Sequence, residues 1–168
     1  MYEDCIVKKQ VFTLKECQNL AQKFLEQIKT CAKVSKGVKG YGANRKQFCI
    51  SEVEYQERML SIFELMNHKI ERNWVSIFYP PCDLPLHVDP PVKNWVRLIA
   101  LLQKPETGAE IKICEKKYEN EIIIPLEVGD IYQLPADKYY HGVSFFSKGI
   151  PRVVMGFDFK IKEILWMV

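Results

Sequence analysis

The second half of the chain is a series of short apolar or alternating segments, and this pattern limits the fold more than any other feature. Pro, Gly, Asp and Asn, which are typical of turns, separate the segments. Alternation of apolar and polar residues over about four to eight positions is typical of half-buried strands. The pattern predicts seven strands, at residues 74–79, 96–102, 111–114, 121–125, 131–134, 142–146 and 153–159. Such a series is typical of an all-β sandwich, jelly roll or barrel.

The first half of the chain has the signals of two helices. Thr13 and Glu16 form a capping box, in which the Thr13 hydroxyl accepts a hydrogen bond from a free backbone N–H. A second box, from Ser51 to Glu54, begins another apolar stripe, which ends near Asn73. Apolar residues recur at helical spacing behind the boxes, at Leu20, Phe24, Ile28 and Cys31 and at Leu60, Phe63, Leu65, Met66 and Ile70. Two helices packed on one face of the strands would give an α+β domain.

The length and composition favour a single domain. A chain of 168 residues, of which 48% are hydrophobic, can bury a sizeable core. We expect residues 1–73 to form a helical support and residues 74–168 to form the β core. Residues 35–44 contain three glycines and predict a loop. This segment does not follow a strand and open a helix, so its glycines do not indicate a phosphate-binding loop.

Charge and targeting signals exclude several classes of protein. The sequence has no run of about 18 apolar residues, and its first residues lack the basic start and apolar stretch of a signal peptide, so we expect neither a transmembrane helix nor a secretion signal. Its six cysteines form no Cys-x-x-Cys pair, so we expect a cytoplasmic protein with free thiols. Residues 1–47 contain ten Lys or Arg and four Asp or Glu, which gives +6, whereas residues 48–168 contain 14 and 17, which gives −3. The spread of the lysines favours a solvated helix face over a nucleic-acid surface.

The chain has three histidines, and two of them can form a metal site with a nearby carboxylate. His87 and Asp89 are two positions apart on an extended segment, so their side chains point to the same side. His141, on a later strand, would complete a two-histidine, one-carboxylate triad, which is typical of non-haem Fe(II) oxygenases. A His-x-Asp pair alone is a weak signal, because a histidine among apolar strands is more often a core residue. His68 lies on a polar stretch of the second predicted helix and has no assigned role.

Arg152 opens the last apolar strand, 11 residues after His141. A guanidinium among apolar side chains is costly unless a carboxylate pairs with it. That carboxylate need not belong to the protein, so Arg152 indicates an acidic ligand.

Around these residues the sequence resembles the Fe(II)/2-oxoglutarate-dependent oxygenases, and most of all their prolyl-hydroxylase-type branch. The matching segments follow the order of the family, at residues 78–81, 87–89, 99–104, 108–113, 127–130, 140–143 and 151–154. The resemblance covers about half of the chain. It implies a double-stranded β-helix, which is a jelly-roll or cupin-like core, with the two N-terminal helices packed on one sheet.

The resemblance also implies catalytic roles. His87, Asp89 and His141 match the iron ligands of the family. Arg152 matches the residue that pairs with the distal carboxylate of 2-oxoglutarate, and a bidentate Arg–carboxylate pair is the strong form of that contact.

Other residues match the surroundings of the cosubstrate. Tyr79 matches an aromatic residue that borders 2-oxoglutarate, and Ile99 and Val143 match apolar wall positions of the cosubstrate site. Leu101 departs from the family, because prolyl hydroxylases that modify transcription factors have a tyrosine there that contacts the cosubstrate. Tyr79 or Tyr132 would then assist the cosubstrate arginine instead.

The activity that the resemblance implies is a dioxygenase reaction with Fe(II), 2-oxoglutarate and O2, with ascorbate as a further candidate cofactor. Its substrate would be hydroxylated at a C–H bond. A protein prolyl or other amino-acid side chain is the first candidate, while free amino acids, other small molecules and nucleobases stay open. The alternatives are a non-catalytic or sensory module that binds metal and 2-oxoglutarate, and a nucleic-acid-oxidising member of the superfamily. We expect a monomer or weak dimer without a membrane partner.

Overall fold

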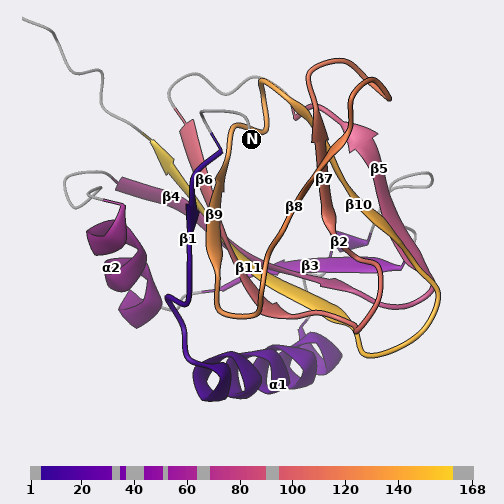
Figure 1. The fold of residues 1–168 in the computed structure, drawn as a ribbon. Coiled ribbons are helices and arrows are strands. Elements are labelled where there is room, and N and C mark those ends of the chain that lie inside the picture. Colours follow the sequence, from indigo (N-terminus) through magenta and orange to yellow (C-terminus); the bar gives the residue numbers. More distant parts are fainter. Residues whose placement is uncertain are drawn as a thin grey trace, which may run out of the picture.

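Two antiparallel sheets face each other in the computed structural model, which describes residues 5–31, 35–36, 44–50, 53–63, 69–89 and 95–160 (Figure 1). The larger sheet has seven strands, in the order β1 (Val7–Lys8), β9 (Ile131–Leu134), β6 (Trp95–Gln103), β11 (Arg152–Lys160), β4 (Lys69–Phe78), β3 (Arg45–Cys49) and β2 (Ser35–Lys36). The smaller sheet has four strands, in the order β5 (Cys82–His87), β10 (Tyr140–Phe146), β7 (Ile111–Cys114) and β8 (Ile122–Ile124). A mostly β domain with two facing antiparallel sheets agrees with the predicted fold class.

Two apolar layers hold the elements together. The first layer lies between the two sheets, and the second lies between the larger sheet and the helices. Neighbouring residues on a strand point to opposite faces, so Val154 joins the first layer, whereas Val153 and Met155 join the second. Strand β11 is therefore buried on both faces over almost its whole length.

Helix α1 (Leu14–Thr30) begins at the predicted capping box. The Glu16 backbone N–H donates to Thr13 Oγ1 at 3.3 Å, and the Thr13 backbone N–H donates to Glu16 Oε2 at 2.8 Å. The buried face of α1 joins the second apolar layer through Cys17, Leu20, Ala21, Phe24 and Ile28. Helix α2 (Val53–Ile62) adds Met59 and Leu60 to the same layer. Within the described ranges, no helix is long and apolar enough to cross a membrane.

The structure contains all seven predicted strands and four further strands that the sequence did not predict. Strands β1 and β2 have two residues each, and β3 is mostly polar. Strand β5 contains Pro85, which argues against a strand except at the edge of a sheet, where β5 lies. The second helix ends at Ile62, so the prediction that it extends to Asn73 is wrong. Residues 69–73 belong to β4, because the pairing of β4 with β11 continues to Lys69.

Some predictions concern residues outside the described ranges. They are Ser51 of the second capping box, His68, and most of the loop predicted at residues 35–44, of which residues 35 and 36 form β2. The division into a support at residues 1–73 and a core at residues 74–168 stays a prediction. Strands β1, β2 and β3 come from the first part and complete the larger sheet.

Candidate metal centre

Two histidines lie opposite each other on neighbouring strands of the smaller sheet. His87 ends β5, and its Cα partner across the antiparallel pair is His141 on β10. The centroids of the two imidazole rings are 4.3 Å apart. Asp89 follows two residues after His87, and its backbone N–H donates to the Ala136 carbonyl at 2.8 Å. The structure thus brings together the three predicted ligands, whose nearest ligand atoms lie within 4.8 Å of one another.

Backbone carbonyls orient both imidazole rings. His87 Nδ1 lies 2.8 Å from the Pro85 carbonyl oxygen, and His141 Nδ1 lies 3.2 Å from the Tyr139 carbonyl oxygen. Because a carbonyl only accepts, each Nδ1 is the ring nitrogen that donates to it, and each Nε2 is the ring nitrogen that can bind a metal ion. Burial lowers the pKa of His141 to about 4, and the neighbouring His87 adds to this effect. A neutral imidazole with a free Nε2 is the form that binds a metal ion.

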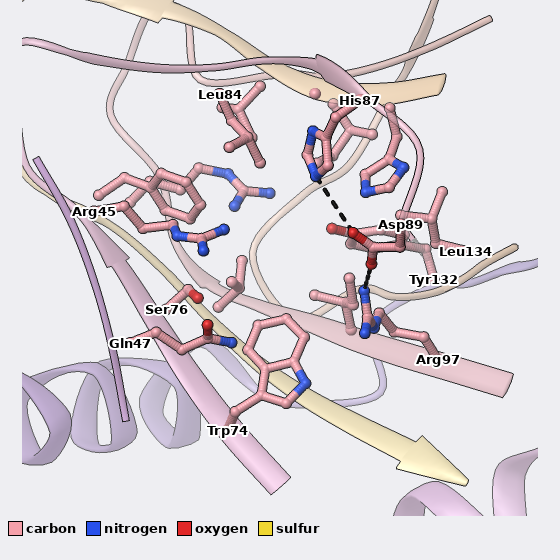
Figure 2. A pocket seen from close by; sticks show the side chains of 18 of the residues that line it. Arg45, Gln47, Trp74, Ser76, Leu84, His87, Asp89, Arg97, Tyr132 and Leu134 are labelled. Atoms are coloured by element: carbon pink, nitrogen blue, oxygen red, sulfur yellow. Dashed lines mark hydrogen bonds and ion pairs between the residues drawn. The ribbon is translucent and has the colours of Figure 1, made fainter. Parts of the chain in front are cut away.

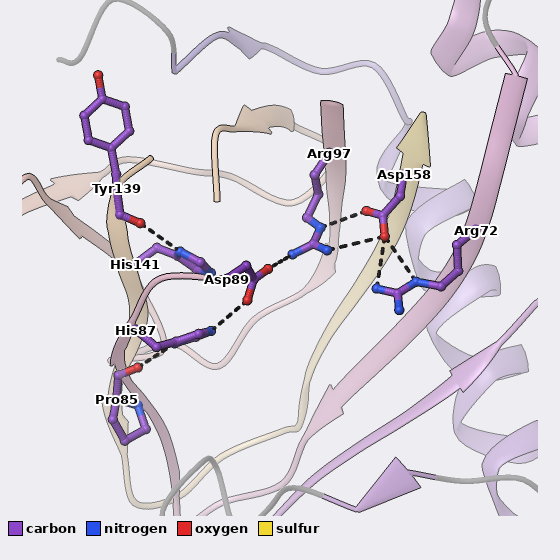
Figure 3. A network of polar contacts seen from close by, with 8 residues as sticks. All are labelled: Arg72, Pro85, His87, Asp89, Arg97, Tyr139, His141 and Asp158. Atoms are coloured by element: carbon purple, nitrogen blue, oxygen red, sulfur yellow. Dashed lines mark hydrogen bonds and ion pairs between the residues drawn. The ribbon is translucent and has the colours of Figure 1, made fainter. Parts of the chain in front are cut away.

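A row of charged side chains on the larger sheet supports Asp89 (Figure 3). Arg97 on β6 pairs with Asp89, and its Nε donates to Asp158 Oδ1 on β11 at 2.8 Å. Arg72 on β4 lies on the other side of Asp158, with 3.0 Å between Nη2 and Oδ2. Asp158 is the Cα partner of both arginines, so the three side chains align across three adjacent strands. We call Arg72, Asp158, Arg97 and Asp89 the charged row.

The surroundings of Asp89 keep its carboxylate ionised. Burial alone would raise the pKa of Asp89, but Arg97, His141 and His87 outweigh burial and hold that pKa below its usual value. The Oδ1 atom of Asp89 lies 3.6 Å from His87 Nε2, while Oδ2 pairs with Arg97. Two imidazoles and one such carboxylate form a donor set that fits one face of an Fe(II) ion and leaves three coordination positions open.

A cavity of about 260 Å³ lies beside the three candidate ligands. Its wall includes Ile99 and Val143, the two apolar positions that the sequence predicted. Polar side chains from β3 and β4 also line it, namely Arg45, Gln47, Arg72, Trp74 and Ser76. Figure 2 shows Arg45 on the opposite side of the cavity from His87 and Asp89. The cavity can therefore hold a ligand between a cationic wall and the candidate metal ligands.

Arg152 lines the same cavity and has an unusual environment. Its side chain is buried, and its Nε and Nη2 have no hydrogen-bond partner among the described residues. The guanidinium lies 5.4 Å from the centroid of the Phe78 ring. Burial raises the pKa of Tyr132, and the charge of Arg152 and its hydrogen bond to the Tyr132 hydroxyl only partly oppose this effect. Buried donors without partners are costly, so Arg152 is suited to a carboxylate ligand.

Tyr79, in contrast to the prediction, does not line this cavity. The preceding residue, Phe78, does line it, and neighbouring residues along an extended segment point to opposite faces. Tyr79 packs against the second apolar layer, where Lys46 Nζ lies 5.4 Å from its ring centroid. Of the two tyrosines considered beside Arg152, Tyr132 is the one in contact with it.

Sequence reasoning missed several polar residues of the site. Arg97 and Asp158 interrupt otherwise apolar strands, and such isolated charges are a signal for pairing, just as for Arg152. Arg45 lies in the polar segment of β3 and has no comparable signal.

Comparisons with known proteins identify the fold. No protein-family model and no protein of curated function matches the sequence. A Pseudomonas putida prolyl-4-hydroxylase shares 11% identity over 96% of this chain and 94% of its own, with a TM-score of 0.72. A Trichoplax adhaerens prolyl hydroxylase, solved with a hypoxia-inducible-factor peptide fragment, shares 12% over 95% and 84%, with a TM-score of 0.73. HygX from Streptomyces hygroscopicus, solved with nickel and 2-oxoglutarate, shares 13% over 95% and 84%, with a TM-score of 0.69.

These likenesses show a shared fold that extends over nearly the whole chain. The chain has the fold of two prolyl hydroxylases and of HygX, a protein that was solved with nickel and 2-oxoglutarate bound. The resemblance expected from the sequence motifs is thus confirmed at the level of the fold.

Proposed function

We propose that this protein is an Fe(II)- and 2-oxoglutarate-dependent dioxygenase that hydroxylates a C–H bond of its substrate. The observation that carries the proposal is that one cavity contains both a candidate metal triad and a buried guanidinium, two of whose nitrogens have no hydrogen-bond partner among the described residues. His87, Asp89 and His141 would hold the metal ion. A triad alone would fit many metal sites. A buried arginine in the same cavity adds a place for a dicarboxylate cosubstrate.

The protein's own residues orient and protect the cosubstrate. Arg152 pairs with its distal carboxylate, and the contact with Tyr132 holds the guanidinium in place. Ile99, Val143 and Leu134 exclude water from the cavity, which strengthens this ion pair. Bound Fe(II) would supply the redox chemistry by which 2-oxoglutarate loses CO2, one oxygen atom of O2 enters succinate and the other enters the substrate C–H bond.

Amino-acid side chains are the first candidates for the substrate. Prolyl hydroxylases are among the similar structures, and one of them was solved with a peptide fragment. HygX has been solved with hygromycin B, so small molecules also occupy this fold. O2 is the required oxidant, and ascorbate is the reductant to include when activity is measured.

Succinate release tests the proposal. The Fe(II)-loaded protein is incubated with 2-oxoglutarate, O2 and ascorbate, and with a panel of prolyl peptides and free amino acids. We expect succinate and a substrate that gains one oxygen atom. Asp89→Ala should abolish both, whereas Asp83→Ala, which removes an exposed carboxylate from β5, should retain them. An intact, metal-loaded wild type that binds 2-oxoglutarate but releases no succinate with any compound would support the non-catalytic alternative, and one that binds no 2-oxoglutarate contradicts both.

A further inference from the structure

Two arginines flank Phe78 and line the same cavity. Phe78 on β4 is the Cα partner of Arg45 on β3 and of Arg152 on β11. All three residues line the cavity, as expected for residues that align across three adjacent strands on one face of a sheet. The cosubstrate proposed above has one distal carboxylate, which pairs with Arg152. Arg45 is therefore a second cation without an assigned ligand.

The charges along the cavity wall are unbalanced. The charged residues that line it are Arg45, Arg72, Arg97, Arg152 and Asp89. Arg72 and Arg97 are neutralised within the charged row of Figure 3. Arg45 and Arg152 pair with no carboxylate in the described part of the chain. One cosubstrate carboxylate at Arg152 leaves the positive charge of Arg45 without an anion on the same sheet.

The environment of Arg45 makes an anionic ligand favourable. Its Nε is buried and has no hydrogen-bond partner within the described ranges. Burial lowers the pKa of Arg45, and the charge of Asp89 across the cavity only partly opposes this effect. An arginine does not lose its proton in a protein, so the cost of burying the charge is removed by an anion.

Other unsatisfied polar groups line the cavity on the same sheet. Trp74 Nε1 and Ser76 Oγ, both on β4, are buried and have no partner among the described residues. Residues 74, 76 and 78 alternate along β4, so their side chains share the face that lines the cavity. Buried polar atoms are normally paired, and three such atoms on one wall therefore indicate a ligand with acceptor oxygens.

We propose that Arg45, with Ser76 as its diagonal neighbour on β4, binds a carboxylate of the substrate that is oxidised. This inference rests on the proposed function and names its substrate class: a small carboxylic acid such as a free amino acid, whose carboxylate lies across the cavity from His87 and Asp89 (Figure 2). A residue within a polypeptide carries an amide in place of that carboxylate. The size of the cavity agrees, because 260 Å³ is below the usual range of about 300–1,000 Å³ for ligand sites and the cosubstrate shares the space.

The test measures two affinities in the Zn(II)-loaded protein, which binds ligands without redox turnover. The first is the affinity for 2-oxoglutarate, measured by calorimetry. The second is the affinity for propionate at saturating 2-oxoglutarate, measured by ligand-detected NMR, with propionamide as the uncharged counterpart. Arg45→Met should weaken propionate binding by about tenfold or more and change 2-oxoglutarate binding by less than about threefold. Arg152→Met should have the opposite pattern.

Lys46→Met is the matched control, because Lys46 is the next residue on β3 and contacts Tyr79 on the other face of the sheet. It should change neither affinity. Arg45→Gln replaces Arg45→Met if the latter does not fold.

The proposal is overturned if Arg45→Met weakens 2-oxoglutarate binding as much as Arg152→Met does, since the two arginines would then share one carboxylate of the cosubstrate. It is also overturned if propionate and propionamide bind equally. A wild type that binds no 2-oxoglutarate contradicts the proposed function, while propionate binding to the metal-loaded protein still tests Arg45.

Discussion

Replacing Arg97 by methionine should lower the free energy of unfolding by about 2–3 kcal/mol. The variant keeps an unbranched apolar chain but leaves Asp89 without its cation and leaves Asp158, which is 1% exposed, with Arg72 alone. Removal of one member of a buried ion pair costs about 3–5 kcal/mol. The value expected here is smaller, because the Arg97 side chain is 21% exposed and Arg72 still contacts Asp158. With a slope of about 2 kcal/mol per molar urea, the unfolding midpoint should fall by about 1–1.5 M.

Arg72→Met is the control for this prediction. Arg72 contacts the same Asp158 but is 49% exposed and does not touch Asp89, so its loss should cost about 1 kcal/mol or less. Adding Asp158→Asn to the Arg97 variant removes a buried charge that keeps only the half-exposed Arg72 as its cation, and it should recover part of the stability. If Arg97→Met costs less than about 1 kcal/mol, or no more than Arg72→Met, the charged row does not contribute as a buried network.

Three further predictions test other parts of the structure. His141→Ala removes one member of the triad, so elemental analysis after dialysis should find bound Mn(II) reduced from about one per chain to less than about 0.1. Gly156→Ala places a Cβ 2.1 Å from the Trp74 ring and should cost about 1–3 kcal/mol in urea unfolding; an unchanged midpoint would contradict this contact. Burial would raise the pKa of Asp130, but Lys9 and two backbone N–H groups outweigh it and lower that pKa. The stability that Asp130 provides is then present above about pH 4 and lost at lower pH, so the gap in unfolding free energy between wild type and Asp130→Asn should shrink from pH 7 to pH 3.

The sequence predicted the parts of the site that depend on local geometry. His87 and Asp89 lie two positions apart on one extended segment, and this spacing alone places both side chains on the same side. The strands of the second half were predictable for the same reason, because their apolar residues alternate or form short buried runs.

The parts that the sequence did not predict depend on strand register. Asp158 meets Arg97 and Arg72 only because β11 pairs with β6 and β4 in one particular register, and no local pattern specifies that alignment. The position of Arg45 also depends on register, because Arg45 lines the cavity only where β3 pairs with β4 so that Arg45 lies opposite Phe78. For Tyr79, the motif match identified the segment but not the face of the sheet on which the side chain lies. A shift of one residue from Phe78 moves its side chain to the other face of the sheet, so a match of motifs placed it on the wrong side.

The most direct test of the central claim is a calorimetric titration of 2-oxoglutarate into the wild type, with and without Mn(II). One 2-oxoglutarate should bind per chain, and only in the presence of the metal. Arg152→Met should weaken this binding by about tenfold or more. Binding that does not require the metal, or that is unchanged in Arg152→Met, would contradict the assignment of this cavity as a 2-oxoglutarate site.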